Sequence, residues 1–227
     1  MPVLRFYGWE PYCLSIGYHQ KMELIDQLKL QQDGYDLVRR PTGGRAIFHA
    51  EELTYSIHIP KSMLHHQQLY FFIHDVFTRA LHDQGYSVDL KQSKDALPKI
   101  TNQPDDIPCF TKSAWSEVQF EGKKVIGSAQ KIYQDAILQH GSILIGKFHG
   151  CLPQYLNIDR DKSRIIEQEM LEKTICLNEI NGRPITSDLL ITAILNQLEL
   201  MTNISVNSQD LSKSECQSAK KYMNRFC

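Results

Sequence analysis

The chain has 227 residues, of which 42% are hydrophobic and 22% charged, a composition typical of one globular domain with a full apolar core. It holds 25 Lys and Arg against 26 Asp and Glu, so no net charge favours binding to nucleic acid or an anionic membrane surface. No apolar segment is long enough to cross a bilayer, and no basic and then apolar leader follows Met1. We therefore expect a cytoplasmic protein with no membrane partner.

The first half of the chain predicts short strands around one long helix. Residues 64–85 have apolar side chains at helical spacing, which places Leu69, Ile73 and Val76 in the core and the histidines of this helix on its solvent side. A shorter helix is expected over 23–32, ending before Gly34. The predicted strands are residues 3–7, 13–18, 36–40, 46–49, 53–59 and 87–90.

A Gly-Gly pair lies among arginines directly after the strand 36–40. Gly43 and Gly44 are flanked by Arg39, Arg40 and Arg45, and His49 ends the next strand. Backbone N–H groups in such a loop can converge on an anion or a carbonyl oxygen, with the arginines adding charge. A purely structural turn remains an equal alternative. The glycine spacing matches neither a Walker loop nor a Rossmann fingerprint.

Glu121-Gly122 predicts a tight hairpin turn in the stretch from Cys109 to Ser142. Strict alternation on the returning strand would place Lys124, Ile126 and Ser128 on one face. The small residues Gly127, Ser128 and Ala129 then suggest a slot where a ligand or a second chain approaches the backbone, although Gly127 could simply mark a bulge.

The last part of the chain predicts one more interior strand and then helices. Residues 136–145 form the strand, in which His140 is either a wall group or a catalyst and Gly141 permits close backbone approach. From about residue 152 helices dominate. Thr186 is expected to cap one helix, and Ser212 forms a capping box with Glu215 at the start of the last.

The six cysteines are scattered, with no C-x-x-C pair and no zinc-ligand spacing. No metal site is therefore expected. Five of them are interpreted as ordinary thiols of a reducing compartment. Cys109 differs because it lies in a polar, proline-flanked loop beside the lysine-bearing hairpin, where a thiol is more readily exposed and ionised.

These stretches together resemble the biotin/lipoyl protein ligase and lipoyltransferase superfamily, and within it the octanoyltransferases of the LipM type. The matching segments are RFYGWEPYCLSIGYHQ, RRPTGGRAIFHAEELTYSI, the CF pair, EGKKVIGSAQ and LQHGSIL. The resemblance implies an α+β fold with mixed and antiparallel sheets flanked by helices, like the class II synthetase and biotin-lipoyl ligase catalytic domain. It implies one such domain over residues 1–227.

The resemblance also implies an activity: transfer of octanoyl from octanoyl-acyl carrier protein, through a cysteine thioester, to a lysine of lipoyl domains or of the glycine cleavage H protein. No cofactor, nucleotide or nucleic acid is implied. Cys109 would accept the acyl group, and Lys124 would lower the pKa of its thiol and contact the acyl carbonyl. The implied substrate-binding residues are Arg39, Arg40, Gly43, Gly44, His49, Gly127, Ser128, Ala129, His140 and Gly141.

Two departures from the family pattern stand out. From the resemblance we expect no counterpart of the helical segment that usually precedes the first strand. Ala50 occupies the position where relatives usually carry an aspartate after the histidine, which bears on the orientation of His49. Three other functions remain open: an ATP-dependent lipoate ligase, an amidotransferase between lipoyl domains, and a non-catalytic carrier-protein binder.

Overall fold

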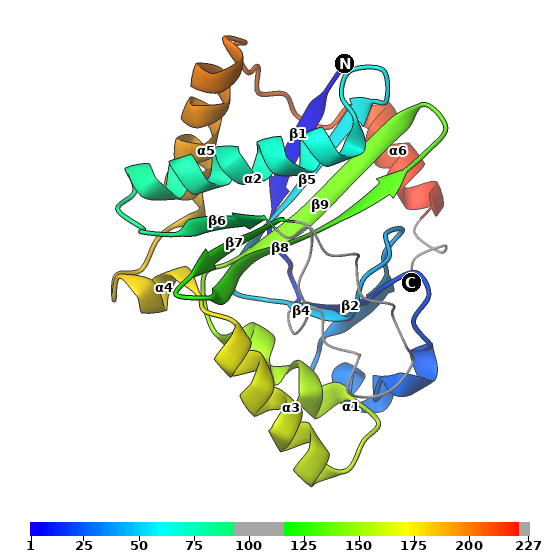
Figure 1. Ribbon diagram of the computed structural model, residues 1–227. Coiled ribbons are helices and arrows are strands. Elements are labelled where there is room, and N and C mark those ends of the chain that lie inside the picture. Colours follow the sequence, from blue (N-terminus) through cyan, green and yellow to red (C-terminus); the bar gives the residue numbers. More distant parts are fainter. Residues whose placement is uncertain (93–115, 223–227) are drawn as a thin grey trace.

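The computed structural model describes residues 1–92 and 116–222, which form two β-sheets flanked by helices (Figure 1). The larger sheet has the order β1-β5-β9-β8-β7-β6, with every neighbouring pair antiparallel. The predicted α+β class is confirmed. The strands of this sheet are β1 (Val3–Tyr7), β5 (Glu52–Pro60), β6 (Asp89–Gln92), β7 (Ser116–Phe120), β8 (Lys123–Ile132) and β9 (Ala136–Leu144).

The smaller sheet has the order β3-β2-β4, with β2 (Cys13–Ile16) parallel to β3 (Asp36–Arg39) and antiparallel to β4 (Ile47–His49). It has an apolar cluster of its own, separate from that of the larger sheet. Helices and 3-10 turns complete the described chain: η1 (Met22–Leu24), α1 (Gln27–Gln32), α2 (His66–Asp83), η4 (Phe148–Tyr155), α3 (Arg160–Lys173), α4 (Leu177–Ile180), α5 (Ser187–Thr202) and α6 (Lys213–Tyr222).

Helix α2 covers one face of the larger sheet, and α5 packs beside it (Figure 1). The predicted core residues Leu69, Ile73 and Val76 are each about 1% exposed. The prediction that all its histidines face solvent is wrong for His74, which is fully buried. Its Nε2 lies 2.8 Å from Ser128 Oγ, so a polar partner inside the core compensates for the lost hydration of the ring.

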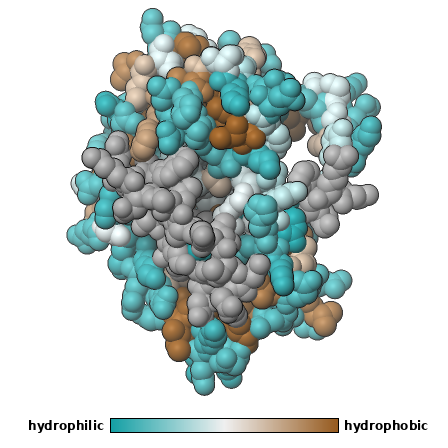
Figure 2. Space-filling model, turned by 45° about the vertical axis from the view of Figure 1, so that its right-hand side comes forward, coloured by the Kyte–Doolittle hydropathy of each residue, from teal (hydrophilic) through white to brown (hydrophobic). Residues whose placement is uncertain are grey.

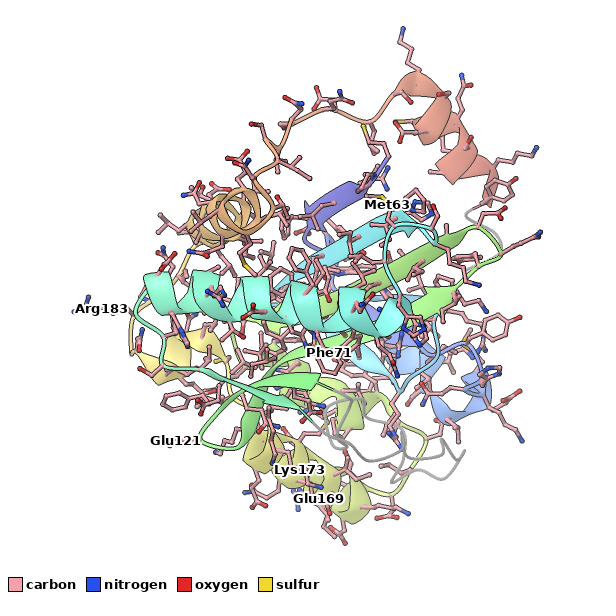
Figure 3. The ribbon with its side chains drawn as sticks, turned by 45° about the horizontal axis from the view of Figure 1, so that its top comes forward. Met63, Phe71, Glu121, Glu169, Lys173 and Arg183 are labelled. Carbon is pink, nitrogen blue, oxygen red and sulfur yellow. The ribbon has the colours of Figure 1, made fainter. Side chains whose placement is uncertain are left out.

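The β7–β8 hairpin forms with Glu121 and Gly122 both at positive φ, as the turn type requires (Figure 3). The predicted alternation along β8 is wrong at its start, because a β-bulge opposite Val118 shifts the register. Val125 and Ile126 consequently both enter the core under α2. Lys124 instead pairs with Glu117, a neighbour of the core residue Val118, on the opposite face of the sheet.

The helix expected over 23–32 is split into η1 and α1 by an extended residue, Ile25. Asp26 starts α1 by accepting a hydrogen bond from Lys29 N at 3.0 Å. Both predicted caps later in the chain are confirmed: Thr186 Oγ1 accepts from Leu189 N, and Ser212 with Glu215 forms a reciprocal capping box.

The face drawn in Figure 2 is mainly hydrophilic, with apolar patches interspersed. Within residues 1–92 and 116–222, no helix combines the length and apolar character needed to cross a bilayer.

Candidate active site

A cavity of about 270 Å³ opens where the smaller sheet meets the larger one. Its volume lies just below the range of about 300–1,000 Å³ that is usual for small-molecule sites, so it suits one small ligand group. Of the substrate-binding residues expected from the sequence, all but Gly43 and Gly44 line it: Arg39, Arg40, His49, Gly127, Ser128, Ala129, His140 and Gly141.

Glycines at the cavity wall allow two backbones to approach closely. A Cβ atom built at Gly141 would lie 2.2 Å from Gly127 O on the neighbouring strand and 2.7 Å from Ser128 Oγ. The small side chains of this part of β8 and β9 thus leave space that larger ones would fill.

A chain of buried polar groups connects both sheets at the cavity wall. Ser15 Oγ of β2 lies 2.7 Å from His49 Nε2 of β4, and His49 Nδ1 lies 2.7 Å from Glu52 Oε1 of β5. The three residues are only 1%, 5% and 6% exposed. Ser15 and His49 both line the cavity. This arrangement of hydroxyl, imidazole and carboxylate is that of a proton-accepting triad.

The neighbours of Glu52 fix the tautomer of His49. Trp9 Nε1 donates to Thr54 Oγ1 at 2.8 Å, so the Thr54 hydroxyl is free to donate to Glu52 Oε1, which lies 2.5 Å away. Ser142 Oγ donates to the same oxygen at 2.7 Å. This oxygen therefore acts as an acceptor, His49 Nδ1–H donates to it, and His49 Nε2 is left as the acceptor facing Ser15.

Trp9 stacks on His49, with ring centroids 4.5 Å apart and an interplanar angle of 15°. The indole fixes the plane of the imidazole and can stabilise a positive charge on it. Glu52 and Trp9 thus orient His49 in this chain, where Ala50 replaces the aspartate that relatives usually carry after the histidine.

Arg39 uses its guanidinium to hold the chain after β2. Its Nη1 donates to the carbonyl oxygens of Gly17, Tyr18 and Gln20 at 3.2, 3.0 and 2.6 Å. Arg39 is also one of the residues that line the cavity.

Arg40 is buried, and it secures the Gly-Gly loop in the same manner. Its guanidinium donates to the carbonyl oxygens of Ser15, Gly43 and Arg45 at 3.2, 3.2 and 2.5 Å, and to Ser15 Oγ at 3.2 Å. The arginines thus bind backbone carbonyl groups of the chain itself, and they position the loop as well as lining the cavity.

His140 is a neutral histidine of the wall. Burial, followed by the guanidinium charge of Arg40 and the neighbouring His49 ring, lowers the pKa of His140 to about 3. Its Nε2 lies 2.6 Å from Thr42 Oγ1. Near neutral pH this ring can exchange hydrogen bonds with a ligand, but it is a weak acceptor for a proton.

Lys124 lies on the same face of the larger sheet as the cavity, though it does not line it. Its Nζ lies 2.6 Å from Glu117 Oε1, and Gln119 Nε2 donates to Glu117 Oε2 at 2.6 Å. Both members of the ion pair are buried, so the carboxylate compensates for the desolvation of the ammonium.

Comparison with known proteins decides the family. The model of the lipoyl protein ligase A/B catalytic domain matches residues 1–199. This chain belongs to that family. A protein named octanoyltransferase LipM from Kyrpidia tusciae is 31% identical over 99% of this chain and 84% of its own length, and one from Brevibacillus brevis is 38% identical over 82% and 70%.

Solved structures agree on the fold of this lipoyl protein ligase A/B family member. A bipartite lipoate protein ligase from Thermoplasma acidophilum, described with its E2 lipoyl domain, has a TM-score of 0.77 and 19% identity, covering 99% of this chain and 80% of its own. A lipoate-protein ligase A bound with ATP has a TM-score of 0.75, 19% identity and coverage of 99% and 82%. At this identity the likeness concerns the fold alone.

One family residue expected from the sequence, Cys109, lies outside the described residues. The described cysteines do not line the cavity. Burial raises the pKa of the Cys151 thiol, and it raises that of Cys176 to about 11, so neither is activated as a nucleophile.

Sequence reasoning missed Ser15, Glu52, Trp9 and Glu117. Glu52 could have been found, since a carboxylate that opens an apolar strand three residues after His49 is unusual. Ser15 and Trp9 gave no comparable signal, because their partners come from strands distant in sequence. The pairing of Glu117 with Lys124 depends on the register of the hairpin, which the bulge shifts. Within the described ranges, no group of three or more His, Cys, Asp and Glu side chains could hold a metal ion.

Proposed function

We propose that this protein transfers an octanoyl group from octanoyl-acyl carrier protein, through a thioester on Cys109, to a lysine of lipoyl-domain proteins in lipoate biosynthesis. The observation that carries the proposal is the similarity over nearly the whole chain to proteins named octanoyltransferase LipM. The small cavity, with Gly127 and Gly141 in its wall, suits a short acyl chain.

The chemistry of a thioester relay fits the residues of this site. A thiol with a pKa of about 8.5 is only slightly ionised at neutral pH, so a nearby cation increases the reactive thiolate. Lys124 is the proposed cation, and Glu117 holds its ammonium in a defined position. Cys109 attacks the carrier-protein thioester, and the carrier thiol leaves with the electron pair of the broken bond.

We propose the acceptor protein by analogy with the lipoate protein ligase from Thermoplasma acidophilum. The Thermoplasma structure is described with an E2 lipoyl domain, so a lipoyl domain that presents one lysine is the acceptor we propose here. Attack by the lysine amine converts the thioester into a more stable amide, and no nucleotide is consumed.

Mass spectrometry of the intact protein tests the proposal directly. Incubation with octanoyl-acyl carrier protein should add one octanoyl group that hydroxylamine removes, and Cys109→Ala should abolish the adduct. Cys216→Ala is the matched control, because Cys216 is exposed on α6 and does not line the cavity. A Cys109→Ala protein that retains full activity with ATP and free lipoate would instead indicate a ligase.

A further inference from the structure

The family resemblance assigns no residue to take the proton from the acceptor lysine. A lysine ammonium has a pKa of about 10.4, so almost none of it is the nucleophilic amine at pH 7. An acyltransferase that uses it gains from a proton acceptor at the reacting centre. Near the cavity, Lys124 is already cationic and paired with Glu117, and the low pKa of His140 makes it a weak base.

His49 is the better placed acceptor, but neither of its ring nitrogens is open. Nδ1 is occupied by Glu52 and Nε2 by Ser15. Because Ser15 lines the cavity, a proton from the cavity can reach His49 Nε2 through the Ser15 hydroxyl. Glu52 and the stacked Trp9 ring stabilise the positive charge that His49 then carries.

We propose that Ser15, His49 and Glu52 form a proton relay that deprotonates the acceptor amine in the second half of the transfer. This inference rests on the proposed function and adds residues to it. Ser15 touches the incoming amine, His49 stores the proton, and Glu52 is a positioning residue that fixes the tautomer of His49.

The step balances in protons and electrons. The ammonium gives one proton to Ser15 Oγ while the hydroxyl proton of Ser15 moves to His49 Nε2. The freed amine attacks the thioester carbon, and the carbon–sulfur bond breaks with its electron pair leaving on the sulfur of Cys109. The second proton leaves the nitrogen as the tetrahedral intermediate collapses and neutralises that thiolate.

The environment of His49 is mixed in charge, which matters for any pH profile. Glu52 faces it from β5, Arg40 from the end of β3 and His140 from β9, and Tyr7 of β1 lies near Glu52. Arg40 also donates to Ser15 Oγ, so it favours the oxygen that has passed on its proton.

Two nucleophiles separate the relay from a merely structural role. The enzyme is first loaded from octanoyl-acyl carrier protein, and the adduct is measured by mass spectrometry. It is then discharged either by a lipoyl domain, whose lysine needs deprotonation, or by hydroxylamine, whose nitrogen is largely unprotonated at pH 7. Ser15→Ala should load normally, lose about 100-fold in the discharge rate to the lipoyl domain, and stay within about threefold of wild type with hydroxylamine.

Two further variants keep the test decisive. Glu52→Gln should show the same selective loss, while Ser163→Ala should not, because Ser163 is a partly buried serine of α3 that donates to Pro153 O away from the cavity. The defect of Ser15→Ala should shrink as the pH is raised from 7 to 9, since more of the acceptor lysine is then unprotonated.

The outcomes distinguish this inference from the function it rests on. Equal loss with both nucleophiles, or no loss with either, would overturn the relay and leave the acyl-enzyme intact. Failure of the wild type to acquire an adduct would overturn both.

Discussion

The two faces of the larger sheet carry opposite chemistry on the same strands. On β5, Leu53 and Tyr55 enter the apolar core under α2, whereas Glu52 and Thr54 join the polar chain at the cavity. On β9, Ile143 lies in the core and Ser142 contacts Glu52. One face thus stabilises the fold through apolar burial, and the other supplies the polar groups of the cavity wall. Substitutions on the two faces should therefore have different effects on stability and on activity.

The largest effect on stability is expected on the core face. Phe77→Ala should lower the free energy of unfolding by about 4 kcal/mol, because Phe77 is 1% exposed and its ring packs edge-on against Tyr55 at 4.7 Å. Urea denaturation measures the loss. Phe71→Ala on the same helix is the control and should cost much less, because Phe71 is only half-buried. A similar loss for both would mean that the core does not extend to Phe77 as described.

The next effect concerns the ion pair at the start of β8. Glu117→Ala should cost about 3 kcal/mol, because it removes the carboxylate that compensates for the buried ammonium of Lys124. Urea denaturation again measures the loss. Glu121→Gln, in the exposed turn of the same hairpin (Figure 3), should change stability by less than about 0.5 kcal/mol. An unchanged Glu117→Ala protein would show that the pair contributes nothing to stability.

Substitutions at two glycines test whether close backbone contact fixes the position of the Gly-Gly loop. A Cβ at Gly17 would lie 2.0 Å from Gly44 O, whereas one at Gly43 has nothing within 4 Å. Gly17→Ala should therefore displace the Gly-Gly loop, which should lower the free energy of unfolding by about 2 kcal/mol and slow the acylation of the enzyme. Gly43→Ala should cost far less. The rate at which the octanoyl adduct forms measures acylation, and urea denaturation measures stability, for both variants. Equal behaviour of the two variants would contradict the close contact.

The smallest effect is a pH dependence of stability that arises from His140. Its pKa is lowered in the fold, so the unfolded chain binds the proton more readily. The stability it contributes is present above the unfolded pKa of about 6.5 and is lost as the pH falls from there toward 3. Between pH 7 and 5.5 the wild type should lose about 1 kcal/mol more than His140→Gln, which cannot titrate. Parallel stability profiles for the two proteins would refute this assignment.

Local signals predicted much of the fold. The periodicity of α2, the Glu121-Gly122 turn and the caps at Thr186 and Ser212 depend on residues close in sequence, and the structure confirms each. The bulge opposite Val118 was not predictable, because it depends on how two strands register in three dimensions. Because of this bulge, Lys124 lies on the face of the sheet opposite to Ile126, whereas simple alternation places the two residues on the same face.

Family resemblance supplied half of the cavity-lining residues, since motif segments mark the strands that meet there. It did not supply the partners that orient them. The contacts of His49 with Ser15 and Glu52, and that of Lys124 with Glu117, are made across strands, and no single segment contains such a network.

The indole of Trp9 gives the protein a built-in optical signal. The chain has two tryptophans, Trp9 and Trp115, so Trp115→Phe would leave Trp9, which is stacked on His49 at the cavity, as the single tryptophan. Its fluorescence should respond when a fatty chain displaces water next to the ring and when the imidazole becomes charged. Loading and discharge could then be followed in real time on unlabelled protein.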